Sequence, residues 1–284
     1  MQSQRTSIAR LLHYLRDNRA MPPHTFITEA MASSDRIEGA VKAFAVLESF
    51  DFERQRLNAT LTAQRTGLTR AAARRHLLTL AHIGYLESDG SYYWLAPKVL
   101  RLAGSYLSSA RLPRAVQPTL NRLARDTGQA FSVVVLDGAD AVIVARSGEH
   151  RNASRVMPMG IHLGARLPAF ATSTGRVLLA GLDAAGLTQR LDSLKPYALT
   201  PHTLTKKTAI RTAVGKVQKQ GFCYVAQEHE LDLHALAVPL RDTKGQVLAA
   251  LNLVQNPIVH KAEDFQKRYL PVLLQAEGEI RGLL

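Results

Sequence analysis

The order of helical patterns and turns between residues 36 and 95 is the feature that most constrains the fold of this chain. Apolar residues at helical spacing predict three short helices, near 36–50, 58–65 and 70–83. Gly67 and Gly84 end the second and third helices, because glycine tolerates a positive φ. Asp89-Gly90 then predicts a β-hairpin. Helix, helix, tight turn, helix and hairpin is the order of a winged helix-turn-helix domain.

Two of these helices have an apolar stripe that we expect to be buried. The first helix, with Asp35 and Glu38 as a capping pair, has the stripe Ile37, Val41, Phe44 and Leu47. The third helix has the stripe Ala73, Leu77, Leu80 and Ile83. In the hairpin, we expect Trp94 to pack beneath the helices.

The opposite side of the third helix is rich in arginine. Six arginines lie between residues 54 and 75 with no acidic residue among them, and the net charge of the chain is +13. Arginine can bond to guanine edges or grip phosphates, and alanine keeps the helix thin enough for the major groove of operator DNA. A solvated basic face without a partner is the alternative. With the hairpin as the wing, the expected DNA contacts are Thr69, Arg70, Ala71, Arg74, Arg75, Ser91 and Tyr92.

Composition and motifs exclude several classes of protein. The sequence contains no run of about 18 apolar residues, so no membrane span is expected. Charges interrupt the apolar part of the N-terminus, which makes it a poor signal peptide. Cys223 is the only cysteine, so an intrachain disulfide and a CxxC metal site are excluded. GxSxG, P-loop and GxGxxG motifs are missing. We therefore expect a cytoplasmic protein without a cofactor and without a membrane partner.

These patterns divide the chain into four segments. They are an N-terminal extension at 1–35, a winged helix-turn-helix domain at 36–96, a linker helix at 97–113 and an effector-binding domain at 114–284. The linker helix opens at Pro97 and offers a dimer contact through Leu100, Gly104 and Leu107. Pro113 and Pro118 should interrupt the chain before a helix restarts at 118–127.

The second half of the chain mixes strand and helix patterns. Strands are expected on both sides of Asp137-Gly138, in GFCYVAQ, and in the pair LDLHALAVPL and QVLAALNLV. Helices are expected over 206–220 and from about Glu263 onward. Antiparallel strands with interspersed helices make an α+β domain with a central antiparallel sheet.

The segment GARLPAFATSTGRVLLAG, residues 164–181, is the most informative part of this domain. Gly164 and Pro168 predict an irregular loop, and Thr172 or Ser173 can cap the helix that follows. A helix N-terminus with hydroxyls around it and Arg166 nearby suits a carboxylate. A capped helix that binds nothing is the alternative.

A cluster of acids and histidines occupies QEHELDLH, residues 227–234. On a strand, alternation would place Glu228, Glu230, Asp232 and His234 on one face, where a metal site is conceivable. The spacing matches no fixed ligand motif. We therefore favour a loop that enters a strand, with one or two side chains turned into a pocket.

Taken together, these motifs resemble the IclR family of bacterial transcriptional regulators over roughly residues 37–275. The resemblance rests on TAQRTGLTRAAARRHLLTLAHIGYLESDG, LGARLPAFATSTGRVLLAG and AVPLRDTKGQVLAALNLV. Within the family, ARRHLLTL and LTPHTLT are most similar to the branch that regulates the β-ketoadipate pathway, whose members respond to 4-hydroxybenzoate, protocatechuate or β-ketoadipate. The resemblance implies a winged helix, a linker helix, a GAF-like effector domain, and dimers or dimers of dimers.

The resemblance also implies the position of the effector pocket. Some family members have Cys and Ser where this chain has Ala235 and Asn252, which argues against a glyoxylate- or pyruvate-like effector. His234 and Asn252 are the candidates for bonding a distal hydroxyl or a second carboxylate. The expected effector site consists of Gly164, Ala165, Arg166, Phe170, Thr172, Ser173, Thr174, Glu228, His234, Ala235 and Asn252.

The chain is thus predicted to be a DNA-binding regulator that responds to a small aromatic or dicarboxylic acid. The alternative is a small-molecule enzyme or metalloprotein with a helical accessory domain. The arginines of the third helix discriminate between the two, since an enzyme would keep its activity without them.

Overall fold

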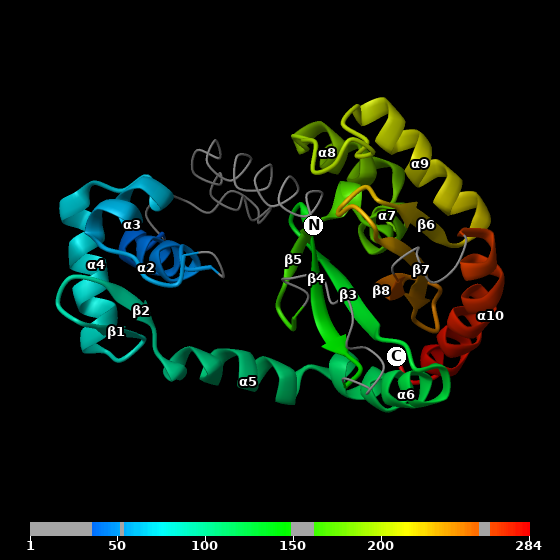
Figure 1. Ribbon diagram of the computed structural model, residues 1–284, viewed down its shortest axis with the longest axis horizontal. Helices are drawn as coiled ribbons and strands as arrows, with labels where there is room; N and C mark the ends of the chain where they lie inside the picture. Colours follow the sequence, from blue (N-terminus) through cyan, green and yellow to red (C-terminus); the bar gives the residue numbers. More distant parts are fainter. Residues whose placement is uncertain (1–35, 52–53, 149–161, 256–261) are drawn as a thin grey trace, which may run out of the picture. The chain divides into compact units, whose positions relative to one another are not determined.

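The computed structural model describes residues 36–51, 54–148, 162–255 and 262–284 (Figure 1). The chain divides into two compact units, Met1–Ser105 and Tyr106–Leu284. The division falls inside one helix, α5 (Leu100–Ser109). The N-terminal extension at 1–35, which includes the expected capping residue Asp35, lies outside the described residues.

The first unit has the order of elements that the sequence predicts. Its helices and strands are α2 (Glu38–Glu48), α3 (Ala59–Thr66), α4 (Arg70–His82), β1 (Leu86–Ser88) and β2 (Tyr93–Leu95). The two strands pair in an antiparallel hairpin, and Leu57 adds a single bridge to Tyr93. The core of the unit consists of Val46, Phe50, Leu57, Leu77, Leu80, Leu86 and Tyr93. The winged helix-turn-helix prediction is therefore confirmed.

Of the expected apolar stripe of the first helix, only Leu47 packs against the core. Ile37 is 74% exposed and Phe44 is 55% exposed, whereas Val46 is fully buried. Spacing identifies an apolar stripe but does not say which side meets the neighbouring helices, and α2 packs on α3 and α4 through Val46 and Leu47. In α4, Ile83 is likewise 45% exposed, because the helix ends at His82 and the chain turns at Gly84.

Proline does not interrupt the chain at 113 or 118. After η1 (Pro97–Val99) and α5, helix α6 runs continuously over Arg111–Thr127. Pro113 lies in the first turn, where the missing N–H costs no helical hydrogen bond. Pro118 removes one hydrogen bond inside the helix, and the burial of Val116, Leu120 and Leu123 against the sheet offsets that loss.

The second unit is built on a six-stranded antiparallel sheet in the order β5-β4-β3-β8-β7-β6. The strands are β3 (Phe131–Asp137), β4 (Asp140–Arg146), β5 (Arg166–Pro168), β6 (Cys223–Ala226), β7 (His234–Arg241) and β8 (Val247–Gln255). The turn at Asp137-Gly138 and the pairing of the last two strands confirm the sequence prediction. The central antiparallel sheet and the α+β class are confirmed as well.

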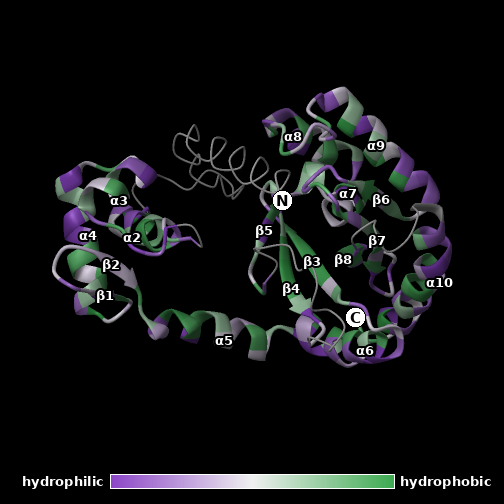
Figure 2. Ribbon diagram, viewed as in Figure 1, coloured by the Kyte–Doolittle hydropathy of each residue, from purple (hydrophilic) through white to green (hydrophobic). Residues whose placement is uncertain are grey.

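Helices cover both faces of this sheet (Figure 1). Helix α6 and the C-terminal helix α10 (Ala262–Arg281) pack on one face, where the largest apolar cluster lies. On the other face is α7 (Ser173–Ala180), preceded by η2 (Ala169–Ala171) and flanked by α8 (Ala184–Ser193) and α9 (Lys207–Gln220). Because helices cover the sheet, its strands are apolar and the outer helices carry polar residues. Figure 2 shows hydrophobic colour along β3 and β4 and hydrophilic residues on α9.

Candidate DNA interface and effector site

Helix α4 presents its arginines to solvent because of how it is capped and buried. Thr69 is the N-cap, and its hydroxyl accepts a hydrogen bond from the Ala72 amide at 3.2 Å. Gly67, with φ at 70°, ends α3 two residues earlier and makes the turn tight. The buried residues Ala73, Leu77 and Leu80 fix the rotation of the helix. As a result, its exposed residues include Thr69, Arg70, Ala71, Arg74 and Arg75.

The arginines of this region fall into two groups. Arg56 forms an ion pair with Asp89, and Arg65 forms one with Asp51. The arginines of α4, at 70, 74 and 75, have no acidic partner among the residues that the structure describes. Acidic residues from outside the segment 54–75 therefore neutralise two of its arginines, and the positive charge without an acidic partner is concentrated on α4. Burial, together with the charges of Lys42 and Arg75, lowers the pKa of His76 on the same helix.

The hairpin that forms the wing is held by its own side chains. Asp89 accepts hydrogen bonds from the amides of Ser91 and Tyr92, at 3.0 and 2.8 Å, and these bonds are the main reason that its pKa is lowered. The guanidinium of Arg56 lies 4.7 Å from the ring centre of Trp94. Trp94 is half-buried there, so the expectation that it packs beneath the helices is wrong. Tyr93 takes that place, because alternate residues of a strand face opposite sides.

In the second unit, the beginning of α7 is completely enclosed. Thr172 is the N-cap, and its hydroxyl accepts a hydrogen bond from the Gly175 amide at 3.1 Å. A Cβ built on Gly175 would lie 2.2 Å from the backbone of Ala169, so only glycine fits this contact. Every residue from Ser173 to Leu179 is buried. Such a helix start keeps its amide groups away from bulk water.

Two buried polar atoms on the α7 side of the sheet have no partner in the part of the chain that the structure describes. They are the hydroxyl of Ser173, a residue that is 1% exposed, and Oδ1 of Asn252. Asn252 lies on β8 between Ala237 of β7 and Ser132 of β3, on the face of the sheet that α7 covers. Buried polar atoms are normally hydrogen-bonded, so two unpaired ones on the same side of the sheet suit a ligand.

The structure places Ala235 and His234 on opposite faces of the sheet. Ala235 pairs with Val254 on the α7 face. The His234 ring instead lies beside Tyr224, whose hydroxyl is 2.7 Å from its Nδ1, and Tyr224 packs on Phe265 of α10. Placing His234 in one pocket with Ala235 and Asn252 is therefore wrong, because consecutive strand residues point in opposite directions. Burial is the main cause that lowers the pKa of His234.

The loop that enters α7 divides the remaining predicted residues. Gly164, with φ at 80°, turns the chain, and Ala165 is buried on the α7 side of the sheet. Arg166 instead bonds to the carboxylates of Asp137 and Asp140, at 2.6 and 3.1 Å, and so holds the β3–β4 turn. The cation expected beside the helix start is thus engaged elsewhere.

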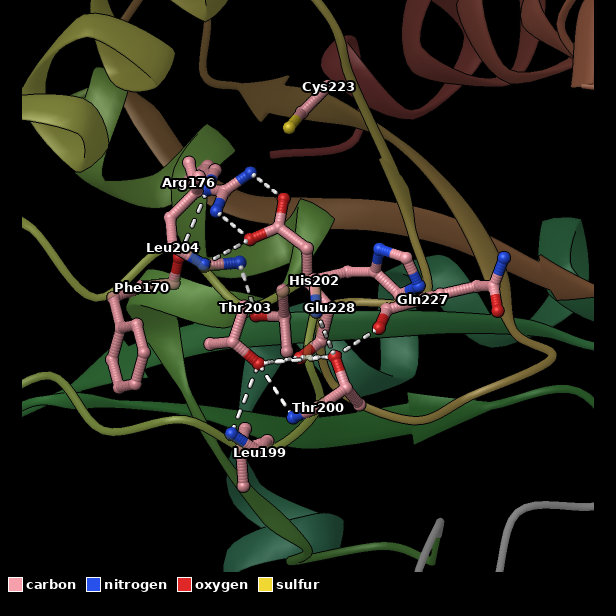
Figure 3. A network of polar contacts seen from close by, with 12 residues as sticks. Phe170, Arg176, Leu199, Thr200, His202, Thr203, Leu204, Cys223, Gln227 and Glu228 are labelled. Atoms are coloured by element: carbon pink, nitrogen blue, oxygen red, sulfur yellow. Dashed lines mark hydrogen bonds and ion pairs between the residues drawn. The ribbon is translucent and has the colours of Figure 1, made fainter.

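A different arginine, Arg176, lies at the beginning of α7 (Figure 3). Its guanidinium faces the carboxylate of Glu228, with N···O distances of 2.7 and 2.5 Å, and the side chains are 4% and 12% exposed. Its Nε donates to the carbonyl of Phe170 at 3.0 Å. The sequence carried one signal for this pair, a single charge among the apolar residues of STGRVLLA.

The acid and histidine cluster at 227–233 is a loop, and β7 begins only at His234. Gln227 and Asp232 have positive φ values of 58° and 61°, which a strand does not permit. The disfavoured alternative, a strand with four alternating side chains on one face, does not occur, and the favoured interpretation, a loop that enters a strand, is confirmed. No group of three or more potential metal ligands occurs among the described residues. Burial raises the pKa of Cys223, on the neighbouring β6, to about 12.

Two further features complete the surroundings of α7. The Phe170 ring meets Tyr197 edge to face at 5.5 Å. A cavity of about 270 Å³ lies at the other end of α7, between α9 and strands β7 and β8. None of the predicted effector residues lines it; its lining is Val177, Ala180, Gly181, Val217, Gln218, Gly221, Pro239, Arg241 and Val247.

Comparison with protein families gives two matches. The family described as "Bacterial transcriptional regulator IclR C-terminal" matches residues 104–281, and the "IclR helix-turn-helix domain" matches residues 39–90. No helix among the described residues is long and apolar enough to span a membrane.

Comparison with individual proteins gives relatives from Acinetobacter. The "Pca operon regulatory protein" of Acinetobacter baylyi is 46% identical, covering 88% of this chain and 90% of its own length. The "p-hydroxybenzoate hydroxylase transcriptional activator" of the same organism is 42% identical, covering 92% and 97%. A solved structure, the inducer-binding domain of a double mutant of PobR from Acinetobacter in complex with 3-hydroxybenzoic acid, is 38% identical, with a TM-score of 0.58, and covers 61% of this chain and 99% of that one.

Proposed function

Because this chain belongs to the IclR family of bacterial transcriptional regulators, we propose that it controls genes for the catabolism of aromatic acids and that a small carboxylic acid controls it in turn. It is a regulator and not an enzyme, because the family and the similar proteins are transcriptional regulators. A protein that binds an operator works in the cytoplasm, and we place this one there.

One observation carries the proposal for an acid, namely the unpaired hydroxyl of Ser173 in the buried first turn of α7. The N-terminal amides of a helix and its dipole favour an anion. Thr172 satisfies the amide of Gly175, which leaves the preceding amides and the Ser173 hydroxyl for a carboxylate. Enclosure strengthens such hydrogen bonds, because the local dielectric constant is low.

The sheet face that α7 covers suits a ring or a short carbon chain. Ala235, Ala237 and Val254 lie on this face in β7 and β8, and Asn252 is the polar group among them. The similar proteins named for the Pca operon and for p-hydroxybenzoate hydroxylase support an effector from that chemistry. We propose 4-hydroxybenzoate, protocatechuate or β-ketoadipate.

Calorimetric titration tests this proposal. Wild type and Ser173→Ala are titrated with the three acids and with benzoate. At least one acid should bind wild type, and Ser173→Ala should bind it more weakly by about 1–3 kcal/mol. Ser193→Ala, which removes an exposed hydroxyl from α8, is the control. A wild type that gives no heat with any of the four acids contradicts the proposal.

DNA binding is proposed for the exposed side of α4 and for the wing. Replacing Arg74 or Arg75 by Ala should weaken operator binding by about 1–3 kcal/mol if a base contact is lost. If a phosphate contact is lost, binding to all sequences should weaken alike, and the salt dependence should become shallower. Arg125→Ala, an exposed arginine of α6, is the control in footprinting. Unchanged affinity in both α4 variants would remove α4 as the recognition helix.

We propose that the protein works as a dimer or a dimer of dimers. A single DNA-binding module makes a small interface, and operators commonly contain two half-sites. Leu100 and Tyr106 of α5 are 66% and 47% exposed, which suits a contact with a second copy. Sedimentation should give a dimer or a larger assembly at micromolar concentration. A monomer that protects one half-site tightly would contradict this.

A further inference from the structure

The ion pair between Arg176 and Glu228 joins segments that lie far apart in the sequence (Figure 3). Arg176 is in the first turns of α7 and is bonded to the Phe170 carbonyl of η2. Glu228 is in the loop before β7, and its carboxylate also accepts a hydrogen bond from the Leu204 amide at 3.1 Å. The pair therefore connects η2, α7 and the segments around 204 and 228.

Two threonines extend this connection. The Thr203 hydroxyl donates to the main-chain carbonyl of Glu228 at 2.6 Å, and the Thr200 hydroxyl donates to the carbonyl of Gln227 at 2.6 Å. The Thr203 hydroxyl also accepts from the Thr200 amide at 2.9 Å. The segment 199–204 is thus attached to the loop at 227–228 by side chains, since neither forms a strand there.

The charges of the pair make it unsuited to bind the acid directly. The Nη1, Nη2 and Nε atoms of Arg176 all have partners, and the two opposite charges cancel. A cation near a helix N-terminus is opposed by the helix dipole and is costly to bury without a counter-charge. Glu228 supplies that counter-charge. An acid that displaced Glu228 from Arg176 would have to break a buried, bidentate pair.

We propose that Arg176 and Glu228 are positioning residues, which hold the segments 199–204 and 227–228 beside the first turn of α7 and do not touch the effector. This assigns Glu228 a role through Arg176 instead of a place among the ligands of the acid. The inference rests on the proposed function, because it assumes that an acid binds at this helix start.

The test uses the full-length protein and three variants. Glu228→Gln removes the charge and keeps the shape, and Arg176→Met removes the cation. The double variant Arg176→Met/Glu228→Leu replaces the pair by apolar groups, which often restores stability where a single change does not. Glu279→Gln, which removes the charge of an exposed ion pair with Arg122, is the matched control.

Two measurements follow each variant. The first is amide hydrogen exchange without a ligand, in which the segments 199–204 and 227–228 should exchange at least about tenfold faster in Glu228→Gln and in the double variant. The strands β3 and β8 should be unchanged in the double variant. The second is titration with 4-hydroxybenzoate, protocatechuate and β-ketoadipate, whose binding should weaken about tenfold, a change that corresponds to about 1.4 kcal/mol.

The double variant separates positioning from plain stability. Its thermal midpoint should return toward that of wild type, while its exchange stays fast and its acid affinity stays low. Recovery of both exchange and acid affinity would overturn the inference, and so would unchanged exchange in every variant. If wild type binds none of the acids, the proposed function fails, and the exchange result alone decides whether the pair holds these segments.

Discussion

Helices α4 and α7 have the same kind of N-cap, but the first turn of α4 is exposed to solvent and that of α7 is buried. Each has a threonine N-cap, Thr69 or Thr172, whose hydroxyl accepts the amide three residues later. Each carries arginine close to that cap. On α4 the arginines are exposed and have no acidic partner among the described residues, whereas Arg176 on α7 is 4% exposed and is bonded to Glu228 and to the Phe170 carbonyl.

This difference shows that burial decides what an arginine near a helix start can do. An exposed guanidinium keeps its hydration and its charge, and is free to meet a polyanion. A buried one needs a carboxylate of its own, after which it holds neighbouring segments in place. The same residue type therefore belongs to the proposed DNA-binding surface in the first unit and to the internal support of the proposed effector site in the second.

The largest expected difference in stability is between variants in which methionine replaces an arginine of α7 or of α4. Arg176→Met should lower the free energy of unfolding of the second unit by about 3–5 kcal/mol, because the largely buried carboxylate of Glu228 loses its counter-charge. Arg74→Met should change stability by no more than about 0.5 kcal/mol, since its side chain is exposed. Urea unfolding checks both. Equal losses in the two variants would abolish the distinction.

Gly175→Ala should have the next largest effect. The added Cβ would meet the backbone of Ala169, and relieving that overlap should cost about 1–3 kcal/mol or more. Gly215→Ala in α9, where nothing lies within 4 Å of the new atom, is the control and should be neutral or stabilising by up to about 1 kcal/mol. Thermal unfolding of both variants provides the measurement. A stable Gly175→Ala protein would mean that the start of α7 is loosely packed.

The two caps offer a smaller and more symmetrical comparison. Thr69→Ala and Thr172→Ala should each lower the free energy of unfolding of their own unit by about 1 kcal/mol. Their functional consequences should separate, with weaker operator binding in the first variant and weaker acid binding in the second. Urea unfolding combined with footprinting and calorimetry resolves the two. A cap variant that affects both kinds of binding equally would show that the sites are not independent.

The smallest effect concerns pH. Burial lowers the pKa of His234 in the folded protein, so the unfolded chain binds more protons when the pH falls below about 6.5. Stability should therefore be fully present above that value and decline as the pH falls toward 5. His234→Gln should reduce this dependence in the second unit, where His229, whose pKa burial also lowers, keeps part of it. His76, whose pKa is also lowered, keeps the dependence of the first unit unchanged. A steeper decline in the variant would refute the assignment.

Local patterns were sufficient for most of the fold. Spacing of apolar residues located the helices of the first unit, and Asp137-Gly138 located the turn between two strands that pair as expected. Such signals depend on residues a few positions apart, which is why they can be read without a structure. The same reasoning placed Arg70, Arg74 and Arg75 on one exposed side of α4.

Tertiary contacts decided what the patterns could not. The choice between two apolar sides of α2 depends on α3 and α4, and the continuity of α6 through Pro118 depends on the sheet beneath it. Arg176 and Glu228 are 52 residues apart, so no local spacing connects them. The side of the sheet on which His234 lies depends on the residue at which β7 begins and on the register of β7 with its neighbours.

The alternation along β7 has a consequence for engineering a biosensor from this protein. Ala235 and Ala237 face α7, whereas Leu236 and Val238 belong to the apolar cluster beneath α10. With the acid bound as proposed on the α7 face, the residues that shape the recognised molecule and those that keep the domain assembled are encoded by adjacent codons. A library restricted to the two alanines should then vary selectivity, while the apolar layer beneath α10 retains its native residues.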